Sequence, residues 1–197
     1  MFIKKTSRLK VGDPTSIETD VGPLSSKEGL ETISGIVEDA KEKGAEILLG
    51  GNEIDGKGFF YQPTILTNIK PDMRIAQEET FGPVAPLFSF ATEEEVIARA
   101  NDTPFGLASY FYTTDLAKSW RVSEQLEYGM VGLNTGIVST EMAPFGGIKE
   151  SGMGREGSKY GVEDYLEIKY IHIQRKLQIF DIFEIHIYTI VIDIYCL

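Results

Sequence analysis

The stretch at residues 144–156, PFGGIKESGMGRE, is the most informative part of this sequence, together with EETFGP at residues 78–83. The first stretch belongs to a glycine-dense loop at 134–151, which has polar and aromatic side chains between its glycines. The loop follows an apolar run at 130–133 that we expect to form a strand. Ligands of open α/β sheets bind beyond the carboxyl ends of the strands, so the loop marks a candidate site. Read alone, it is equally well explained as a surface loop that needs glycine for turns with positive φ.

Helical and extended segments alternate around this loop, which predicts an α/β fold with a mainly parallel sheet and flanking helices. Ser25 or Ser26 is expected to cap a helix whose apolar side chains recur at helical spacing, and Gly44 to end it. The capping box TEEE at 92–95 is expected to open a second helix that runs to Ala100. The other expected elements are strands at 45–49, 64–66, 85–90, 107–112 and 130–133, a hairpin or loop region at 50–61, and a helix from Thr114 or Asp115 to near Tyr128 that Gly129 closes.

The composition restricts the class of partner. Of 197 residues, 42% are hydrophobic, which is enough for one domain with a core. Nineteen Lys and Arg against 30 Asp and Glu give a formal net charge of -11, which disfavours nucleic acid and anionic membranes as partners. A small metabolite is the expected partner. One cysteine and two histidines offer neither an internal disulfide nor metal-ligand spacing, so we expect no metal and a cytoplasmic protein.

The segment at 152–157, GMGREG, satisfies the G-x-G-x-x-G expression of dinucleotide-binding folds. That motif requires a β-strand immediately before it and a helix after it, whereas PFGG at 144–147 does not read as a strand. The acidic residue that such folds place at the end of a second strand, about 20 residues further on, is also missing. We therefore expect no Rossmann-type site at these glycines.

The two opening stretches resemble the aldehyde dehydrogenase superfamily and, within it, the succinate-semialdehyde dehydrogenase branch. The resemblance covers residues 2–173. It implies a partial, incomplete C-terminal part of the catalytic domain at 1–163 and an oligomerisation strand at 164–173, with a homo-oligomeric complete enzyme. The Ile-rich tail at 174–197 matches nothing in the family and is interpreted as strand-prone sequence that did not evolve with this fold. Supporting motifs are GLASYFY at 106–112, EYGMVGLN at 127–134, GSKYG at 157–161 and EIKY at 167–170.

The resemblance implies a cofactor contact at two residues of the upstream stretch. Glu79 would hold the nicotinamide ribose of NAD or NADP, and Phe81 would contact the nicotinamide ring. A carboxylate can accept hydrogen bonds from both ribose hydroxyls, and an aromatic ring two residues on can orient the nicotinamide. The alternative is that Glu78 and Glu79 are solvated charges and Phe81 is a core residue. The choice between NAD and NADP stays open, because the cofactor fold is implied to precede this segment.

On the substrate side, the resemblance places Ser139 and Phe145 in the aldehyde tunnel. A hydroxyl at Ser139 can donate a hydrogen bond to a distal carboxylate, which favours succinate semialdehyde over an apolar aldehyde. Thr140 is the alternative hydroxyl, and a water-facing loop serine is the alternative for Ser139 itself. Similar enzymes complete this carboxylate site with arginines, at least one of which would lie upstream of Met1.

The implied reaction is attack of a cysteine thiolate on the aldehyde, hydride transfer to NAD(P), and hydrolysis of the thioester by a glutamate-activated water. That cysteine and that glutamate are implied to lie upstream, and the only cysteine here is Cys196 in the tail. No catalytic residue is assigned within the chain, and the isolated chain is expected to be inactive. Two alternatives remain open: an inactive remnant or association module, and another enzyme such as a glutarate-semialdehyde dehydrogenase. A transit peptide in a missing N-terminus would make the location mitochondrial instead of cytoplasmic.

Overall fold

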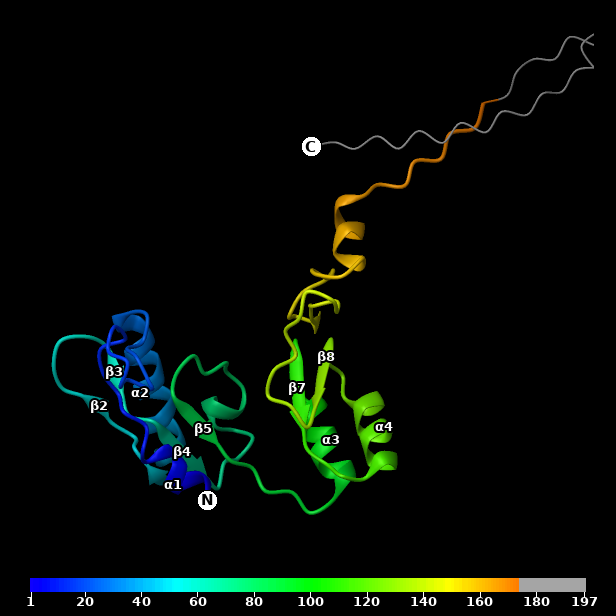
Figure 1. The fold of residues 1–197 in the computed structure, drawn as a ribbon. Coiled ribbons are helices and arrows are strands. Elements are labelled where there is room, and N and C mark those ends of the chain that lie inside the picture. Colours follow the sequence, from blue (N-terminus) through cyan, green and yellow to red (C-terminus); the bar gives the residue numbers. More distant parts are fainter. Residues whose placement is uncertain (174–197) are drawn as a thin grey trace, which may run out of the picture.

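The computed structural model describes residues 1–173, which form two halves joined by the segment around residues 87–92 (Figure 1). The predicted strand-prone tail at 174–197 lies outside the described residues. The first half contains α1 (Phe2–Thr6), α2 (Lys27–Glu42), β1 (Glu46–Leu49), β2 (Glu53–Ile54), β3 (Phe60–Tyr61), β4 (Thr64–Thr67), the 3-10 helix η1 (Arg74–Ala76) and β5 (Val84–Pro86). The second half contains α3 (Glu93–Asn101), β6 (Phe105–Gly106), β7 (Ala108–Phe111), α4 (Leu116–Gln125), β8 (Met130–Leu133), β9 (Ile148–Lys149) and the 3-10 helix η2 (Tyr160–Tyr165).

The first half is a three-stranded sheet, in the order β1-β4-β5, with α2 packed against it. The central strand β4 pairs antiparallel with β1 and parallel with β5. Helix α2 begins at Ser26, whose hydroxyl accepts a hydrogen bond from Gly29 N at 3.1 Å. It ends where Gly44 adopts a φ of 96°, a conformation that favours glycine. The predicted start and end of this helix are confirmed.

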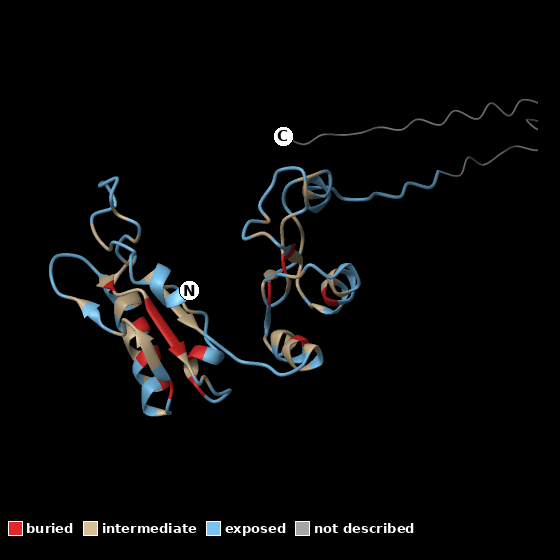
Figure 2. Cartoon of the chain, turned by 60° about the horizontal axis from the view of Figure 1, so that its bottom comes forward, coloured by how far each residue is buried: buried red, intermediate tan, exposed pale blue. Residues whose placement is uncertain are grey.

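The hydrophobic core lies between α2 and this sheet (Figure 2). The helix contributes side chains at the i, i+3, i+4, i+7 spacing that the sequence predicts, and the hydroxyl-bearing Tyr61 is enclosed with them. Burial raises the pKa of Tyr61 to about 12, because the phenolate would lose its hydration there. The buried members of the core are Ile33, Ile36, Val37, Ala40, Ala45, Tyr61, Leu66, Met73 and Ile75.

The second half has a parallel pair, β7-β8, and an antiparallel pair, β6-β9. Only Ile97 of α3 and Val122 of α4 are buried apolar side chains among the described residues of this half. The two helices are joined through Glu93, whose carboxylate accepts hydrogen bonds from the Arg121 guanidinium. This pairing holds the pKa of Glu93 below its usual value.

The α/β fold class with flanking helices is confirmed, but the strand pairing is mixed and not mainly parallel: β4-β5 and β7-β8 are parallel, whereas β1-β4, β2-β3 and β6-β9 are antiparallel. The strand predicted at 85–90 is wrong beyond Pro86, because residues 87–90 make no ladder pairing. The helix predicted to reach Tyr128 ends at Gln125, since Leu126 takes an extended ψ of 121°. Of the predicted oligomerisation strand at 164–173, Asp164 and Tyr165 lie in η2, and residues 166–173 pair with no strand among residues 1–173, so this strand stays a prediction.

Candidate active site

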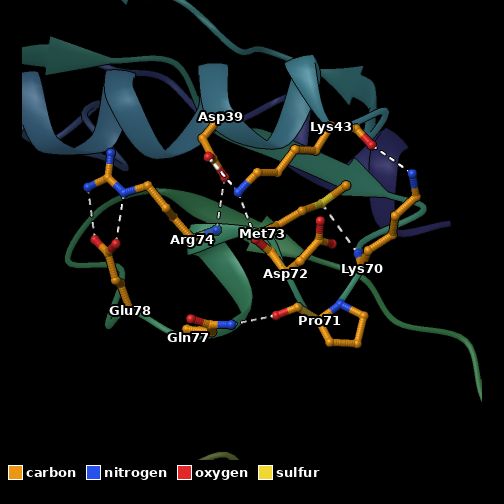
Figure 3. A network of polar contacts seen from close by, with 9 residues as sticks. All are labelled: Asp39, Lys43, Lys70, Pro71, Asp72, Met73, Arg74, Gln77 and Glu78. Atoms are coloured by element: carbon orange, nitrogen blue, oxygen red, sulfur yellow. Dashed lines mark hydrogen bonds and ion pairs between the residues drawn. The ribbon is translucent and has the colours of Figure 1, made fainter.

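The loop that carries Glu79 and Phe81 lies beside the first sheet, between η1 and β5. Both side chains are exposed, and Phe81 has 77% of its surface accessible, so the alternative of a core phenylalanine is wrong within the single chain. Glu78 is different from its neighbour, because its carboxylate is paired with Arg74 (Figure 3). The two consecutive glutamates thus face different surroundings, and Glu79 is the one left available to a ligand.

The glycine-rich loop starts at a fixed point. Asn134, the first residue after β8, has a φ of 55°, a conformation that asparagine tolerates better than most residues. Its side-chain amide donates to Thr113 O at 2.8 Å, and its side-chain oxygen accepts from Thr113 N at 2.9 Å. The loop therefore leaves the carboxyl end of β8 in a direction set by the neighbouring strand β7.

The part of the loop around Gly146 is held by a close contact between two backbone segments and by the side chain of Arg155. Gly129 lies against Gly146, so close that a β-carbon on Gly129 would collide with the Gly146 carbonyl oxygen. The Arg155 guanidinium donates to Gly147 O at 2.8 Å and to Gly154 O at 2.6 Å. Phe145 exchanges two backbone hydrogen bonds, both 2.8 Å long, with Glu156. These contacts fold the loop back on itself and fix where Phe145 sits.

The folded loop lines an open surface pocket of about 380 Å³. Ser139 and Phe145 both line it, as does Thr140, the alternative hydroxyl. Sequence reasoning missed two further lining residues, Glu141 and Glu156, which place two carboxylates in the pocket. Acidic residues in a glycine-rich loop give no signal by themselves, because such residues usually face water. The pocket lining within residues 1–173 includes no lysine or arginine.

The four residues expected at a site fall into two groups. Ser139 and Phe145 share the pocket in the second half, whereas Glu79 and Phe81 share a loop in the first half. The pocket lining includes neither Glu79 nor Phe81, so the two groups do not share one site within residues 1–173. The glycines at 152–157 also lack the surroundings of a dinucleotide site, since β9 ends at Lys149 and η2 begins only at Tyr160. No group of three or more side chains suited to hold a metal occurs within residues 1–173.

A model of the aldehyde dehydrogenase family matches residues 1–171 of this chain. A succinate-semialdehyde dehydrogenase (NADP(+)) of Escherichia coli (strain K12) is 54% identical over 167 residues, which cover 85% of this chain and 35% of that enzyme. A glutarate-semialdehyde dehydrogenase of Pseudomonas putida is 56% identical over 167 residues, covering 85% of this chain and 34% of the enzyme. The structure of an NAD+ complex of an aldehyde dehydrogenase from Bacillus cereus superposes with a TM-score of 0.81 at 38% identity, over 85% of this chain and 34% of that one.

The chain belongs to the aldehyde dehydrogenase family. Its resemblance to the semialdehyde dehydrogenases is confirmed, since relatives that carry this name share about half of its residues. The chain spans about a third of the length of these relatives. No helix within the described part of the chain has both the length and the apolar character that a membrane crossing requires.

Proposed function

We propose that this chain is the C-terminal part of an NAD(P)-dependent dehydrogenase that oxidises succinate semialdehyde to succinate. The observation that carries the proposal is the pocket at the carboxyl end of β8, which brings Ser139 and Phe145 together in a member of the aldehyde dehydrogenase family. Ser139 would donate a hydrogen bond to the distal carboxylate of the substrate, and Phe145 would pack against its carbon chain. Two of the relatives are named for succinate semialdehyde and glutarate semialdehyde, and both of these aldehydes carry a carboxylate at the other end of the molecule.

The cofactor side of the proposal rests on Glu79 and Phe81. Both are exposed on a loop that is tied to the first half, so a bound NAD or NADP could reach them without displacing core residues. Glu79 would accept hydrogen bonds from the two ribose hydroxyls, and Phe81 would lie against the nicotinamide ring, which supplies the hydride acceptor. A relative named for NADP(+) and a solved NAD+ complex support both cofactors as candidates.

The acidic lining of the pocket implies that other parts of the enzyme complete it. Glu141 and Glu156 are both exposed, and their negative charges would weaken the binding of a substrate carboxylate in the same pocket. We infer that a cationic side chain from outside residues 1–173 offsets this repulsion, and an arginine suits a carboxylate best because it can bind both oxygens. The catalytic cysteine would also come from outside residues 1–173, because this part contains no cysteine. The single cysteine of the sequence, Cys196, lies in the tail that matches nothing in the family.

Exposed apolar side chains support the same conclusion. The second half leaves large apolar side chains of α4, of the glycine-rich loop and of the residue that follows Phe111 of β7 open to solvent, as surfaces that bind another part of a protein often do. The most exposed of them are Tyr112 at 69%, Leu116 at 74%, Trp120 at 65%, Ile137 at 75% and Met142 at 82%. We infer that this half is covered by further sequence of the complete subunit. Residues 164–173, whose Ile168 is fully exposed, would pair with a neighbouring subunit in a homo-oligomer.

Two experiments test this function. The first is the intact mass of the protein from its native source, captured with an antibody against residues 144–156. A mass well above 21.9 kDa supports a complete dehydrogenase, whereas a mass of 21.9 kDa supports the alternative of an inactive remnant or association module.

The second experiment is a chimera in which residues 1–171 replace the matching third of the Escherichia coli enzyme. Turnover of succinate semialdehyde with NAD or NADP supports the proposal, and its loss in a folded chimera contradicts it. A higher kcat/KM for glutarate semialdehyde would favour the second candidate substrate, which the Pseudomonas putida relative suggests. The 197-residue chain alone is the control and is expected to show no turnover.

A further inference from the structure

We propose that Arg74, Glu78 and Gly82 are positioning residues that fix Glu79 and Phe81 by tying both ends of their loop to helix α2. This inference rests on the proposed cofactor role of Glu79. The loop is short, because only Glu79, Thr80 and Phe81 separate the two tied residues. A segment of three residues with both ends fixed has few conformations available, so its direction is set by the helix.

The first tie begins at Asp39 on α2. The Asp39 carboxylate accepts a hydrogen bond from the Arg74 backbone N–H at 2.9 Å and pairs with Lys43 at 2.8 Å (Figure 3). Lys43 also donates to the carbonyl oxygen of Asp72 at 2.7 Å, and the side chain of Met73 is fully buried in the core. The turn that contains Arg74 is therefore fastened to α2 by buried packing and by hydrogen bonds of charged groups.

Arg74, held in this way, binds the side chain of Glu78 and restrains it. Its Nε and Nη2 atoms donate to the two carboxylate oxygens of Glu78 at 2.8 and 2.9 Å, a geometry that restrains orientation as well as distance. The Glu78 backbone N–H donates to Arg74 O at 2.8 Å, so the backbone and the side chain act together. The guanidinium lies over Gly35 of α2, where a β-carbon would be 3.2 Å from Arg74 Nη1. A glycine in this helix thus makes room for the arginine.

The second tie is a packing contact at the other end of the loop. A β-carbon on Gly82 would lie 2.8 Å from Cδ1 and 2.9 Å from Cγ1 of Ile33, which is itself buried in α2. The Gly82 N–H donates to Thr80 O at 3.0 Å, which tightens the loop just before this contact. Glu79 and Phe81 therefore project from a turn whose two ends are both held against α2. The two anchoring points on the helix, Asp39 and Ile33, lie about two helical turns apart.

The positioning role is tested first by hydrogen exchange in the 197-residue chain. With Glu78→Gln, the amides of residues 78–84 should exchange about threefold faster, the scale of an exposed ion pair, while the amides of β4 stay unchanged. Glu31→Gln is the matched control, because Glu31 also forms an exposed i,i+4 pair on α2, with Lys27 at 3.1 Å. In the double variant Arg74→Gln with Glu78→Gln, the amides of residues 78–84 should exchange no faster than in the single variants, because both changes remove the same ion pair. Unchanged exchange at 78–84 in Glu78→Gln overturns the proposal.

The consequence for the cofactor is tested in the chimera described above. Glu78→Gln should raise the KM for the cofactor about threefold and leave the KM for the aldehyde unchanged, a separation that general destabilisation would not produce. Glu79→Gln is measured beside it. If Glu79→Gln leaves the cofactor KM unchanged, the proposed contact of Glu79 is wrong. If Glu79→Gln raises that KM but Glu78→Gln does not, the contact stands and the positioning role is overturned.

Discussion

Gly82 packs so tightly against Ile33 that its missing side chain is part of the core packing, because a β-carbon there would lie 2.8 Å from Ile33 Cδ1. We expect Gly82→Ala to lower the free energy of unfolding by about 1–2 kcal/mol, the usual cost of an added methyl group in a packed interior. Urea unfolding followed by circular dichroism measures the change. Gly22→Ala is the control, since its β-carbon would meet Pro14 Cβ at an ordinary 3.6 Å. Equal stability of both variants would contradict the packing seen at Gly82.

A second glycine controls the pocket. Gly129→Ala should push the Gly146 carbonyl away and open the turn that carries Phe145, at a cost of about 2 kcal/mol in stability. Limited proteolysis should then cut residues 134–157 faster than in the parent chain. Gly136→Ala lies in the same loop with its nearest neighbour 3.9 Å away, and it should leave the cleavage rate unchanged. Parent-like cleavage of Gly129→Ala would show that this contact does not hold the loop.

The arginine that closes the loop gives an independent prediction. Arg155→Met keeps much of the side-chain volume but removes the donors to Gly147 O and Gly154 O, leaving two carbonyl oxygens without these partners. We expect a loss of about 1–3 kcal/mol in the free energy of unfolding. In the chimera, the KM for succinate semialdehyde should rise while the cofactor KM stays constant. A rise of both constants together would place the effect outside the pocket.

The substrate assignment predicts a selective effect at Ser139. In the chimera, Ser139→Ala should raise the KM for succinate semialdehyde about tenfold, because a hydrogen bond to a charged group is worth about 1.5 kcal/mol. The KM for butanal, which has no distal carboxylate, should not change. Thr140→Val separates the two hydroxyls of the pocket. A tenfold effect in Thr140→Val and none in Ser139→Ala would move the carboxylate contact to Thr140.

Acid should weaken the fold through carboxylates whose pKa is lowered by their partners. Arg74 lowers the pKa of Glu78 and Arg121 that of Glu93, both from an ordinary value of 4.5, and Lys43 lowers that of Asp39 from 3.8. A pKa that is lower in the folded state gives stability that is present above the unfolded pKa and is lost as the pH falls through the folded one. The urea midpoint should therefore drop between about pH 5 and pH 3. Glu93→Gln should make this dependence shallower, and an unchanged slope would contradict the contribution of Glu93.

The sequence predicted the elements that follow simple local rules. Helix α2 has a serine cap, apolar side chains at helical spacing and a terminal glycine, and all three features lie where they were expected. The strand at Met130–Leu133 is confirmed with the predicted bounds. Local patterns were misleading where aromatic side chains imitate a strand, as in Phe88 and Phe90, which are exposed in an irregular segment. Side-chain type alone cannot show that no partner strand is available.

The candidate site was predictable only in part, because its geometry depends on contacts between distant residues. Ser139 and Phe145 were expected together, and they line one pocket. The roles of Glu78 and Arg74 were not foreseen, since an ion pair four residues apart outside a long helix leaves no distinctive pattern. Gly129 was interpreted as a helix end, whereas its close approach to Gly146 becomes visible only in three dimensions.

Most buried apolar side chains lie in the first half of the chain, and this affects the order in which the two halves fold during synthesis. The core cluster and the side chains packed on it all lie between Leu24 and Val84, so this part forms its core without needing any residue of the second half. On the ribosome it can fold while the glycine-rich loop is still being synthesised. The second half has few buried apolar side chains of its own when it emerges, so we expect it to stay open for longer than the first half and to be the part that chaperones contact.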